Sequence, residues 1–212
     1  MRKFVTILVA AALLYAGFTR GALAQEGAET APSIQYSLTS EQAKSIIAAR
    51  ARAVMVAIKN RDMARLATFV HPRKGVRFSP YIYVTPKIER VLTRRQIVNL
   101  YRSRKPLVWG EGDASGEPIR MTFRQYLANF VYRQDLLTDK QVGYNPPNRQ
   151  GPGTSINNLL ETYPRSILVR YSHDGIKAPQ GGEPDWQQLW LVFEKFGNQW
   201  YLVGIANNEW TT

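Results

Sequence analysis

Two apolar runs, LWLVFEKF (189–196) and QWYLVGIA (199–206), flank the dipeptide Gly197-Asn198 near the end of this 212-residue chain. A glycine that leads a two-residue turn supplies the positive φ that a type II′ hairpin needs at its first central position. The pattern therefore predicts an antiparallel hairpin of two long strands, and the rest of the fold has to be built around it.

The turn determines which hairpin side chains share a face, because side chains alternate along a strand. One face is predicted to carry Leu189, Leu191, Phe193, Trp200, Leu202, Gly204 and Ala206. The other is predicted to carry Trp190, Val192, Glu194, Tyr201, Val203 and Ile205. Both faces are largely apolar, so both must be covered. We expect a curved sheet with helices on one side and a cavity or a subunit contact, giving a homodimer through the sheet face, on the other.

Residues 1–24 have the features of a secretory signal peptide. Two basic residues precede an apolar run of 15 residues from Phe4 to Phe18, which is short for a membrane span of roughly 20. Small residues lead up to Ala24, so we expect cleavage there; an uncleaved anchor is the alternative. A periplasmic or secreted product without a transmembrane span follows, beginning with a flexible tether over 25–38.

Residues 39–212 are expected to form a single domain. The mature chain of 188 residues is long enough to bury a sizeable core. It contains no cysteine, so burial rather than disulfide bonds must stabilise it in an oxidising compartment.

Charge is distributed unevenly along the mature chain, whose net charge is +9 after the three basic residues of the signal segment are removed. Between Lys44 and Lys105 there are 16 basic residues and only two acidic ones, a local charge of +14. This basic flank, the segment 44–105, suits an anionic surface or an acidic partner, and solvated basic helix faces are the alternative. Export and the absence of recognition motifs exclude nucleic acid as the expected partner.

The remaining pattern predicts mostly helices before the hairpin. Capping boxes begin at Thr39, Thr93 and Thr122, and each precedes apolar residues at helical spacing. A strand is predicted over 76–83, at an edge or broken at Pro80, because proline lacks an amide donor. A second strand is predicted over 166–173, and long loops are expected over 143–155 and 174–184.

This order of elements, ending in the hairpin, resembles the nuclear transport factor 2-like superfamily. The strings at 71–81, 112–119 and 200–210 are similar to an exported bacterial family of unassigned function. The resemblance covers most of residues 39–212. It implies an α+β cone in which a curved antiparallel sheet wraps a long N-terminal helix. Some members of the superfamily, such as ketosteroid isomerase and scytalone dehydratase, are enzymes, but the exported family supplies no catalytic residues to carry over.

Four polar residues, Arg77, Ser79, Tyr81 and Tyr83, are predicted to share one face of the strand over 76–83. The guanidinium fork of Arg77 suits a carboxylate or a phosphate, and a salt bridge fixed on the sheet is the alternative. His71 precedes a proline, so we expect it to end a helix rather than to act as an acid or base.

Tryptophans stand next to carboxylates in three places, at 109–111, 185–186 and 209–210. Rings that stack on the apolar face of a sugar, beside oxygens that accept its hydroxyl protons, suit a glycan, and burial in the core is the alternative. The loop from Asp113 to Glu117 places oxygen atoms at alternate positions but lacks the later glutamate of a calcium loop, so we expect a turn and no metal.

These patterns predict a non-catalytic binding protein for an envelope glycan or an anionic lipid, with no cofactor. The candidate ligand-binding residues are Arg77, Ser79, Tyr81, Tyr83, Trp109, Asp113, Glu117, Asp185 and Trp186. Two alternatives stay open. One is a hydrolase or isomerase that uses Asp113, Glu117 and Arg77, and the other is a self-associating structural module.

Overall fold

The computed structural model describes residues 38–212 apart from 114, 139–140, 147–156, 174–185 and 210–212. The described residues belong to one compact unit, Ile34–Thr212. Its helical segments are α1 (Ser40–Lys59), α2 (Met63–Phe69), α3 (Arg94–Arg102), α4 (Phe123–Tyr126), the π-helical η1 (Leu127–Val131) and α5 (Leu159–Thr162). Its strands are β1 (Val76–Ser79), β2 (Arg90–Leu92), β3 (Leu107–Glu111), β4 (Pro118–Met121), β5 (Val142–Tyr144), β6 (Ser166–His173), β7 (Gln187–Phe196) and β8 (Gln199–Glu209).

Three helices begin at the predicted capping boxes. At Thr39, Thr93 and Thr122 the threonine side chain accepts a hydrogen bond from the backbone of the residue three positions on, whose glutamine side chain bonds back. Each reciprocal pair satisfies two helical N–H groups that otherwise lack partners, and a cap of this kind stabilises a helix by about 1 kcal/mol.

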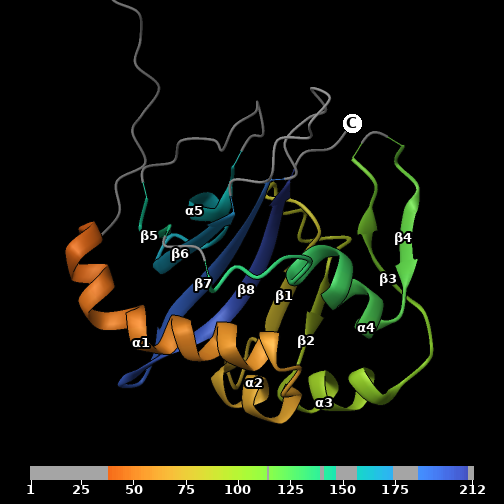
Figure 1. Cartoon of the computed structure of the whole chain (residues 1–212), viewed down its shortest axis with the longest axis horizontal. Helices are drawn as coiled ribbons and strands as arrows, with labels where there is room; N and C mark the ends of the chain where they lie inside the picture. Colours follow the sequence, from red (N-terminus) through yellow and green to blue (C-terminus); the bar gives the residue numbers. More distant parts are fainter. Residues whose placement is uncertain (1–37, 114, 139–140, 147–156, 174–185, 210–212) are drawn as a thin grey trace, which may run out of the picture. The chain divides into compact units, whose positions relative to one another are not determined.

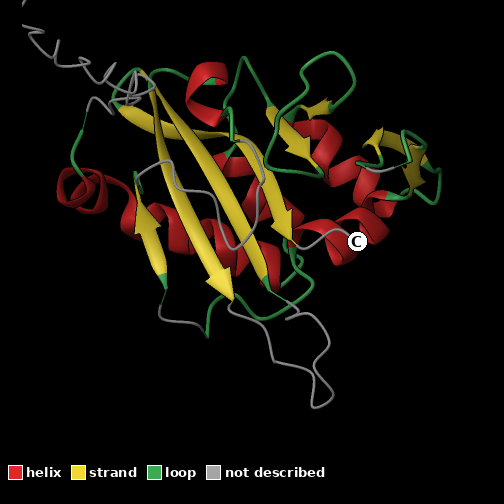
Figure 2. Ribbon diagram, turned by 90° about the horizontal axis from the view of Figure 1, so that it is seen from above, coloured by secondary structure: helices red, strands yellow, loops and turns green. Residues whose placement is uncertain are grey.

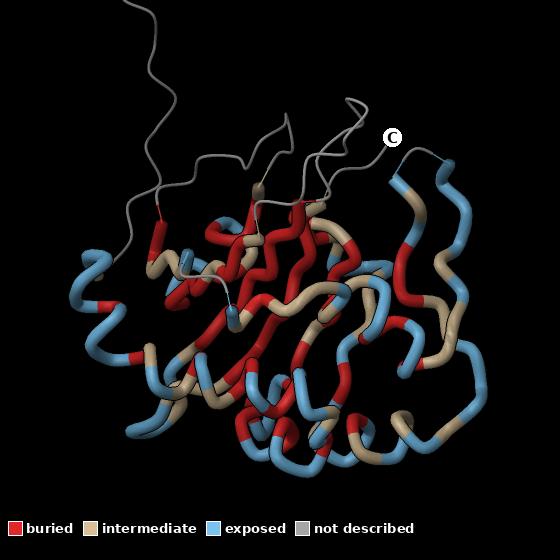
Figure 3. The backbone as a smooth tube through the Cα atoms, viewed as in Figure 1, coloured by how far each residue is buried: buried red, intermediate tan, exposed pale blue. Residues whose placement is uncertain are grey.

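The strands form a mixed α+β architecture with one large, curved and unclosed sheet. Its strand order is β2-β1-β8-β7-β6-β5, and β3 with β4 forms a separate two-stranded ribbon. Figure 1 shows β7 and β8 as long strands in the middle of the sheet, with the β3–β4 ribbon to one side. Burial follows this plan, since the central strands are largely buried, whereas the ribbon is intermediate or exposed apart from Trp109 and Gly110 (Figure 3).

The sheet is not wholly antiparallel, which corrects the sequence-based expectation. β1 pairs with β8 in parallel, and Phe78 lies opposite Ile205. The parallel pairing starts before β1, where Val70 forms a bridge with Leu202 and the amide of His71 donates to the carbonyl of Leu202 at 3.0 Å. Alternation within a strand predicts its faces but says nothing about the direction of a neighbour that is distant in sequence.

The hairpin turn is as predicted, but the faces exchange farther along β8. Gly197 has φ +59° whereas φ of Asn198 is not positive, as a type II′ turn requires, and Phe196 lies opposite Gln199. A β-bulge at Val203 then leaves that residue without an opposite partner, so Leu191 faces Ile205. An extra residue on one strand shifts the alternation by one, and Ile205 and Ala206 therefore lie on the faces opposite to those predicted.

Both faces of the sheet are covered by the same chain. One face packs against α1, α2 and η1 in a large core that contains Leu189, Leu191 and Phe193. The other face carries Trp190 and Val192, and it is covered by α5 and the segment after β1, whose apolar residues are Ile82, Val84, Leu159, Leu160 and Tyr163. Figure 2 shows α5 across the sheet from α1. These side chains fill part of the second face, on which a cavity or a subunit contact was expected.

Two buried asparagines fasten the segments at the rim of the sheet. The Asn158 side chain accepts from the amide of Val84 at 2.7 Å and donates to the carbonyl of Val84 at 2.9 Å. Asn145 extends the pairing of β5 with β6, because its backbone and side chain both bond Leu168. The expectation of a loop from residue 143 onward was therefore wrong for Gly143 and Tyr144, which belong to β5; residues 147–155 of that loop and all of 174–184 lie outside the described residues.

A cluster of stacked aromatic rings fills the space between β1, the β3–β4 ribbon and α4. Trp109 stacks on Tyr126 with ring centroids 4.3 Å apart and on Phe123 at 5.3 Å, and Phe78 meets Phe123 edge-on at 5.3 Å. All four side chains are essentially inaccessible to solvent. We call Phe78, Trp109, Phe123 and Tyr126 the aromatic cluster.

Candidate functional site

The predicted strand face of Arg77, Ser79, Tyr81 and Tyr83 is divided at Pro80. β1 ends at Ser79, so only Arg77 and Ser79 lie on a common strand face. Tyr81 and Tyr83 follow the end of the strand, and Tyr83 is 53% exposed. The missing amide of proline explains the break that the sequence already suggested.

Arg77 and Ser79 meet a carboxylate that the sequence did not single out. Glu89 accepts hydrogen bonds from the Ser79 hydroxyl at 2.8 Å and from the Thr85 amide at 2.9 Å. Arg77 lies 3.9 Å from Glu89 and donates to the Tyr163 hydroxyl at 3.2 Å and to the Pro86 carbonyl at 3.0 Å. Its fork is thus occupied by protein groups, which is the fixed salt bridge that was the alternative for Arg77.

Burial raises the pKa of the Glu89 carboxyl, and the hydrogen bonds from Thr85 and Ser79 and the charge of Arg77 oppose this rise. The Glu89 side chain is only 3% exposed. A carboxylate that is held by three neighbouring groups and shielded from solvent fastens the segment 85–90 to β1. This arrangement is typical of a structural hydrogen-bond network.

The other predicted site residues do not converge. The hydroxyl of Tyr81 accepts from the Asp113 amide at 3.2 Å, whereas Glu117 is exposed in the β3–β4 ribbon. Trp109 belongs to the aromatic cluster, and its ring nitrogen donates to the Met121 carbonyl at 2.9 Å. Trp186 is buried, and Asp185 lies outside the described residues. Neither the groove beside the hairpin tip nor the groove between α1 and α2 is lined by any member of this set.

His71 lies just beyond the end of α2 at Phe69, as its position before proline suggested, and it organises a tight turn. Its Nδ1 accepts from the amides of Arg73 at 3.1 Å and Lys74 at 2.9 Å, and its carbonyl accepts from Gly75 at 3.0 Å. Gly75 has φ +71°, and a Cβ there would lie 2.6 Å from the Leu92 carbonyl oxygen, so no other residue fits without a shift. Because Nδ1 is an acceptor, the imidazole is neutral in this turn.

Burial lowers the pKa of His71, and the charges of Lys74, Arg94 and Arg73 lower it further against the opposing effect of Glu194. The unfolded chain therefore takes up this proton more readily than the folded protein. Stability due to this residue is fully present above a pH of about 6.5, the ordinary histidine value, and is lost as the pH falls from there through the folded pKa.

We expect His71→Asn, which keeps an acceptor near the position of Nδ1, to reduce the slope of unfolding free energy against pH between neutrality and mild acidity. Urea unfolding of both proteins across this range measures the slope. The carboxylates titrate mainly below this pH range, so the slope at lower pH serves as an internal reference. An unchanged slope in the variant would show that His71 does not resist protonation in the folded protein.

A ladder of alternating arginine and aromatic side chains crosses the surface where α1, α2, α3 and β8 meet. The guanidinium carbon of Arg50 lies 5.4 Å from the Phe69 ring centroid and 5.3 Å from that of Tyr201. The guanidinium carbon of Arg65 lies 5.2 Å from the centroid of the same Phe69 ring, and that of Arg94 lies 5.4 Å from the Tyr201 centroid. We call Arg65, Phe69, Arg50, Tyr201 and Arg94 the arginine ladder.

The arginine ladder lacks acidic partners among the described residues. Arg94 donates through Nε to the Val70 carbonyl at 2.8 Å, and no ion pair joins any of the three arginines to a described carboxylate. The Nε of Arg50 is shut off from solvent and has no hydrogen-bond acceptor. Burial lowers the pKa of Arg50, with Tyr201 raising it and the like charge of Arg94 lowering it. Sequence reasoning found only the local charge of +14, not this arrangement.

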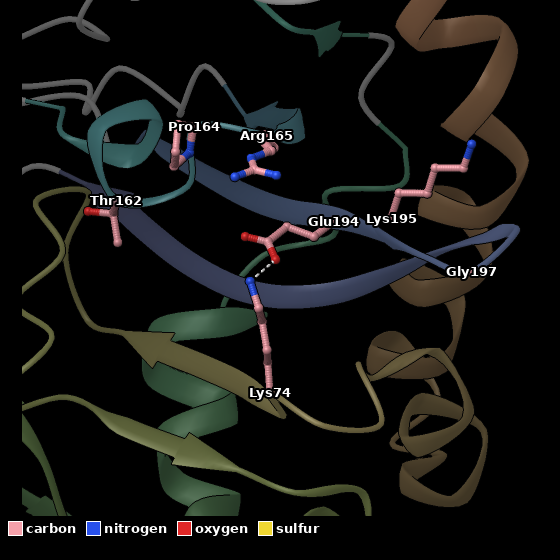
Figure 4. A pocket seen from close by; sticks show the side chains of 7 residues that line it. All are labelled: Lys74, Thr162, Pro164, Arg165, Glu194, Lys195 and Gly197. Carbon is pink, nitrogen blue, oxygen red and sulfur yellow. Dashed lines mark hydrogen bonds and ion pairs between the residues drawn. The ribbon is translucent and has the colours of Figure 1, made fainter.

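A groove of about 740 Å³ lies beside the tip of the hairpin (Figure 4). It is lined by Lys74, Thr162, Pro164, Arg165, Glu194, Lys195 and Gly197. Lys74 forms an ion pair with Glu194, and Figure 4 shows Lys195 pointing away from that pair. The groove therefore mixes both signs of charge and already contains its own counter-ion.

In the part of the chain that the structure describes, no group of three or more histidine, cysteine, aspartate or glutamate side chains is placed to hold a metal ion. Among the same residues, no helix is both long enough and apolar enough to cross a membrane.

No family model and no curated protein matches the chain. Among solved structures, the chain is similar to the crystal structure of a protein from Xanthomonas campestris assigned as a calcium/calmodulin dependent protein kinase II association domain. The two are 15% identical with a TM-score of 0.34, and the match covers 77% of this chain and 85% of that chain. Likeness at this level indicates neither a ligand nor an activity.

Proposed function

We propose that the protein is an exported, non-catalytic binding protein whose basic flank docks on anionic lipid of the cell envelope. The observation that carries the proposal is the arginine ladder, in which three arginines from α1, α2 and α3 have no acidic partner among the described residues. Cations left without counter-ions at a surface favour an anionic partner, which neutralises them on contact.

Lipid is favoured over glycan because two of the predicted sugar-stacking tryptophans are unavailable. Trp109 is 0% exposed and Trp186 is 4% exposed, so neither ring can lie on the face of a sugar. The enzyme alternative is less favoured, since Arg77 is bonded within the fold while Asp113 and Glu117 lie in the exposed turn between β3 and β4.

The proposal includes export by the signal peptide 1–24 and a tether over 25–38 that would let the domain reach the membrane surface. It also includes membership of the nuclear transport factor 2-like superfamily, with α1 as its long N-terminal helix. The element order and the long C-terminal hairpin support this finer assignment.

The test is sedimentation of residues 25–212 with vesicles of equal parts phosphatidylglycerol and phosphatidylcholine, compared with pure phosphatidylcholine. We expect binding only to the anionic vesicles, and loss of binding at high salt, because surface charges are screened. Replacing three exposed flank residues, Arg95, Arg102 and Arg104, by glutamine should weaken binding by about 3 kcal/mol, roughly a hundredfold, at about 1 kcal/mol per charge.

The matched control replaces three exposed basic residues outside the flank, Arg120, Arg165 and Lys195, by glutamine. This variant has the same net charge as the flank variant and should bind nearly as well as the unmodified protein. Equal binding to neutral and anionic vesicles would refute the lipid proposal. An equal loss in both variants would show that net charge, and not the flank, is responsible.

A further inference from the structure

We propose that the arginine ladder forms a binding site for a phosphate-class dianion, held by Arg50 and Arg94 around the ring of Tyr201. This deepens the proposed function and rests on it, because the phosphomonoester of a lipid headgroup such as phosphatidic acid is one source of such a group and free phosphate is the other. Four elements build the site, since Arg50 comes from α1, Phe69 from α2, Arg94 from α3 and Tyr201 from β8.

The geometry places two guanidinium groups around one ring. The guanidinium carbons of Arg50 and Arg94 lie 5.3 Å and 5.4 Å from the centroid of Tyr201. The two like charges are close enough to act on one another, since Arg94 lowers the pKa of Arg50. A dianion that reaches both guanidinium groups would turn this repulsion into attraction on both sides, and a singly charged carboxylate would neutralise only one of the two.

Most donors at this site have no partner among the described residues, although the Nε of Arg50 is shut off from solvent. Among the described residues no acceptor bonds any nitrogen of Arg50, and only the Nε of Arg94 is engaged, by the Val70 carbonyl. Planar guanidinium groups bind phosphate oxygens through paired hydrogen bonds, which are stronger and more specific than contacts from a lysine.

The position of Arg50 is also restricted before any ligand arrives. Its guanidinium group lies between the rings of Phe69 and Tyr201, and the residue is half-buried rather than extended into solvent. A side chain that is already ordered loses less conformational entropy when it binds. The hairpin groove offers no such arrangement, because Glu194 there supplies a negative charge to Lys74.

The first experiment measures the binding of inorganic phosphate to residues 25–212 by thermal unfolding and by ³¹P NMR at constant ionic strength. We expect phosphate to raise Tm, and the rise to continue with the logarithm of the phosphate concentration once this exceeds Kd. Arg50→Gln should bind phosphate roughly tenfold more weakly or worse, since it loses charge-assisted hydrogen bonds. Arg52→Gln removes the same charge from an exposed position on the same helix and should leave phosphate binding unchanged.

A second variant keeps the test decisive if Arg50→Gln does not fold. Arg50→Lys retains the positive charge and most of the aliphatic stem but lacks the fork, so it should also lose phosphate affinity. Phosphate binding by Arg50→Lys as tight as in the unmodified protein would overturn the proposal, as would an unmodified protein whose Tm and ³¹P signal do not respond to phosphate.

Vesicles distinguish the two sources of the phosphate. If Arg50→Gln loses binding to both inorganic phosphate and phosphatidic acid vesicles, the result would support a headgroup site. If Arg50→Gln loses only the binding of inorganic phosphate and retains vesicle binding, the result would support a site for free phosphate and reject the headgroup source. If the unmodified protein binds anionic vesicles but not phosphate, the anion site fails while the proposed function stands.

Discussion

Replacement of Trp109 by alanine is expected to lower the unfolding free energy by about 3–5 kcal/mol, the usual cost of removing a large aromatic side chain from a packed core. Trp109 is 0% exposed, and its ring stacks on Tyr126 and Phe123. Its indole nitrogen also donates to the Met121 carbonyl at 2.9 Å. The variant therefore leaves a cavity and removes the partner of a backbone carbonyl.

Urea unfolding followed by circular dichroism measures this loss without relying on tryptophan fluorescence. Trp200→Ala is the matched control, because Trp200 is only half-buried at the margin of the same core. Its cost should be clearly smaller. A Trp109 variant that is no less stable than the Trp200 variant would mean that the β3–β4 ribbon does not pack its tryptophan into the core.

Replacement of Asn158 by leucine is expected to cost about 2–4 kcal/mol, because it strands a buried amide and a buried carbonyl of the same residue. The Asn158 side chain bonds both backbone groups of Val84, at 2.7 Å and 2.9 Å. Leucine has a similar size but no hydrogen-bonding atoms. The α5 segment and the segment after β1 would lose the link that holds them together over the sheet.

The control for this change is Asn99→Leu, at an exposed position of α3. It makes the same chemical substitution without stranding a buried group, so its effect should lie within about 0.5 kcal/mol. Amide hydrogen exchange adds a local readout, since the amide of Val84 should exchange faster in Asn158→Leu. If the Val84 amide stayed protected, another group would have to satisfy it.

The hairpin and the helix starts could be predicted because they depend on local chemistry. Gly197 specifies the turn, and the threonine and glutamine of each capping box are three residues apart. The bulge at Val203 could not be predicted, because nothing in an apolar run marks the residue that is left unpaired between the strands. The parallel pairing of β1 with β8 could not be predicted either, since its partners are more than a hundred residues apart in the sequence.

The candidate site residues were chosen by residue type, which does not show the partners that the fold gives them. Arg77 and Ser79 were chosen for their polarity. Both contact the buried carboxylate of Glu89, which lies outside the strand that carries them. Trp109 was chosen for its neighbouring carboxylate, although burial decides its role. The arginine ladder was missed for the opposite reason, because its members are spread from Arg50 to Tyr201 and become neighbours only through the fold.

The two edges of the large sheet are its shortest strands. β2 and β5 have three residues each, whereas β7 and β8 between them have ten and eleven. A short edge offers few free backbone groups to a strand from another molecule. The long apolar strands that build this fold are thus flanked by short edges, which limits their exposure as templates for aggregation in a chain that has no disulfide bonds.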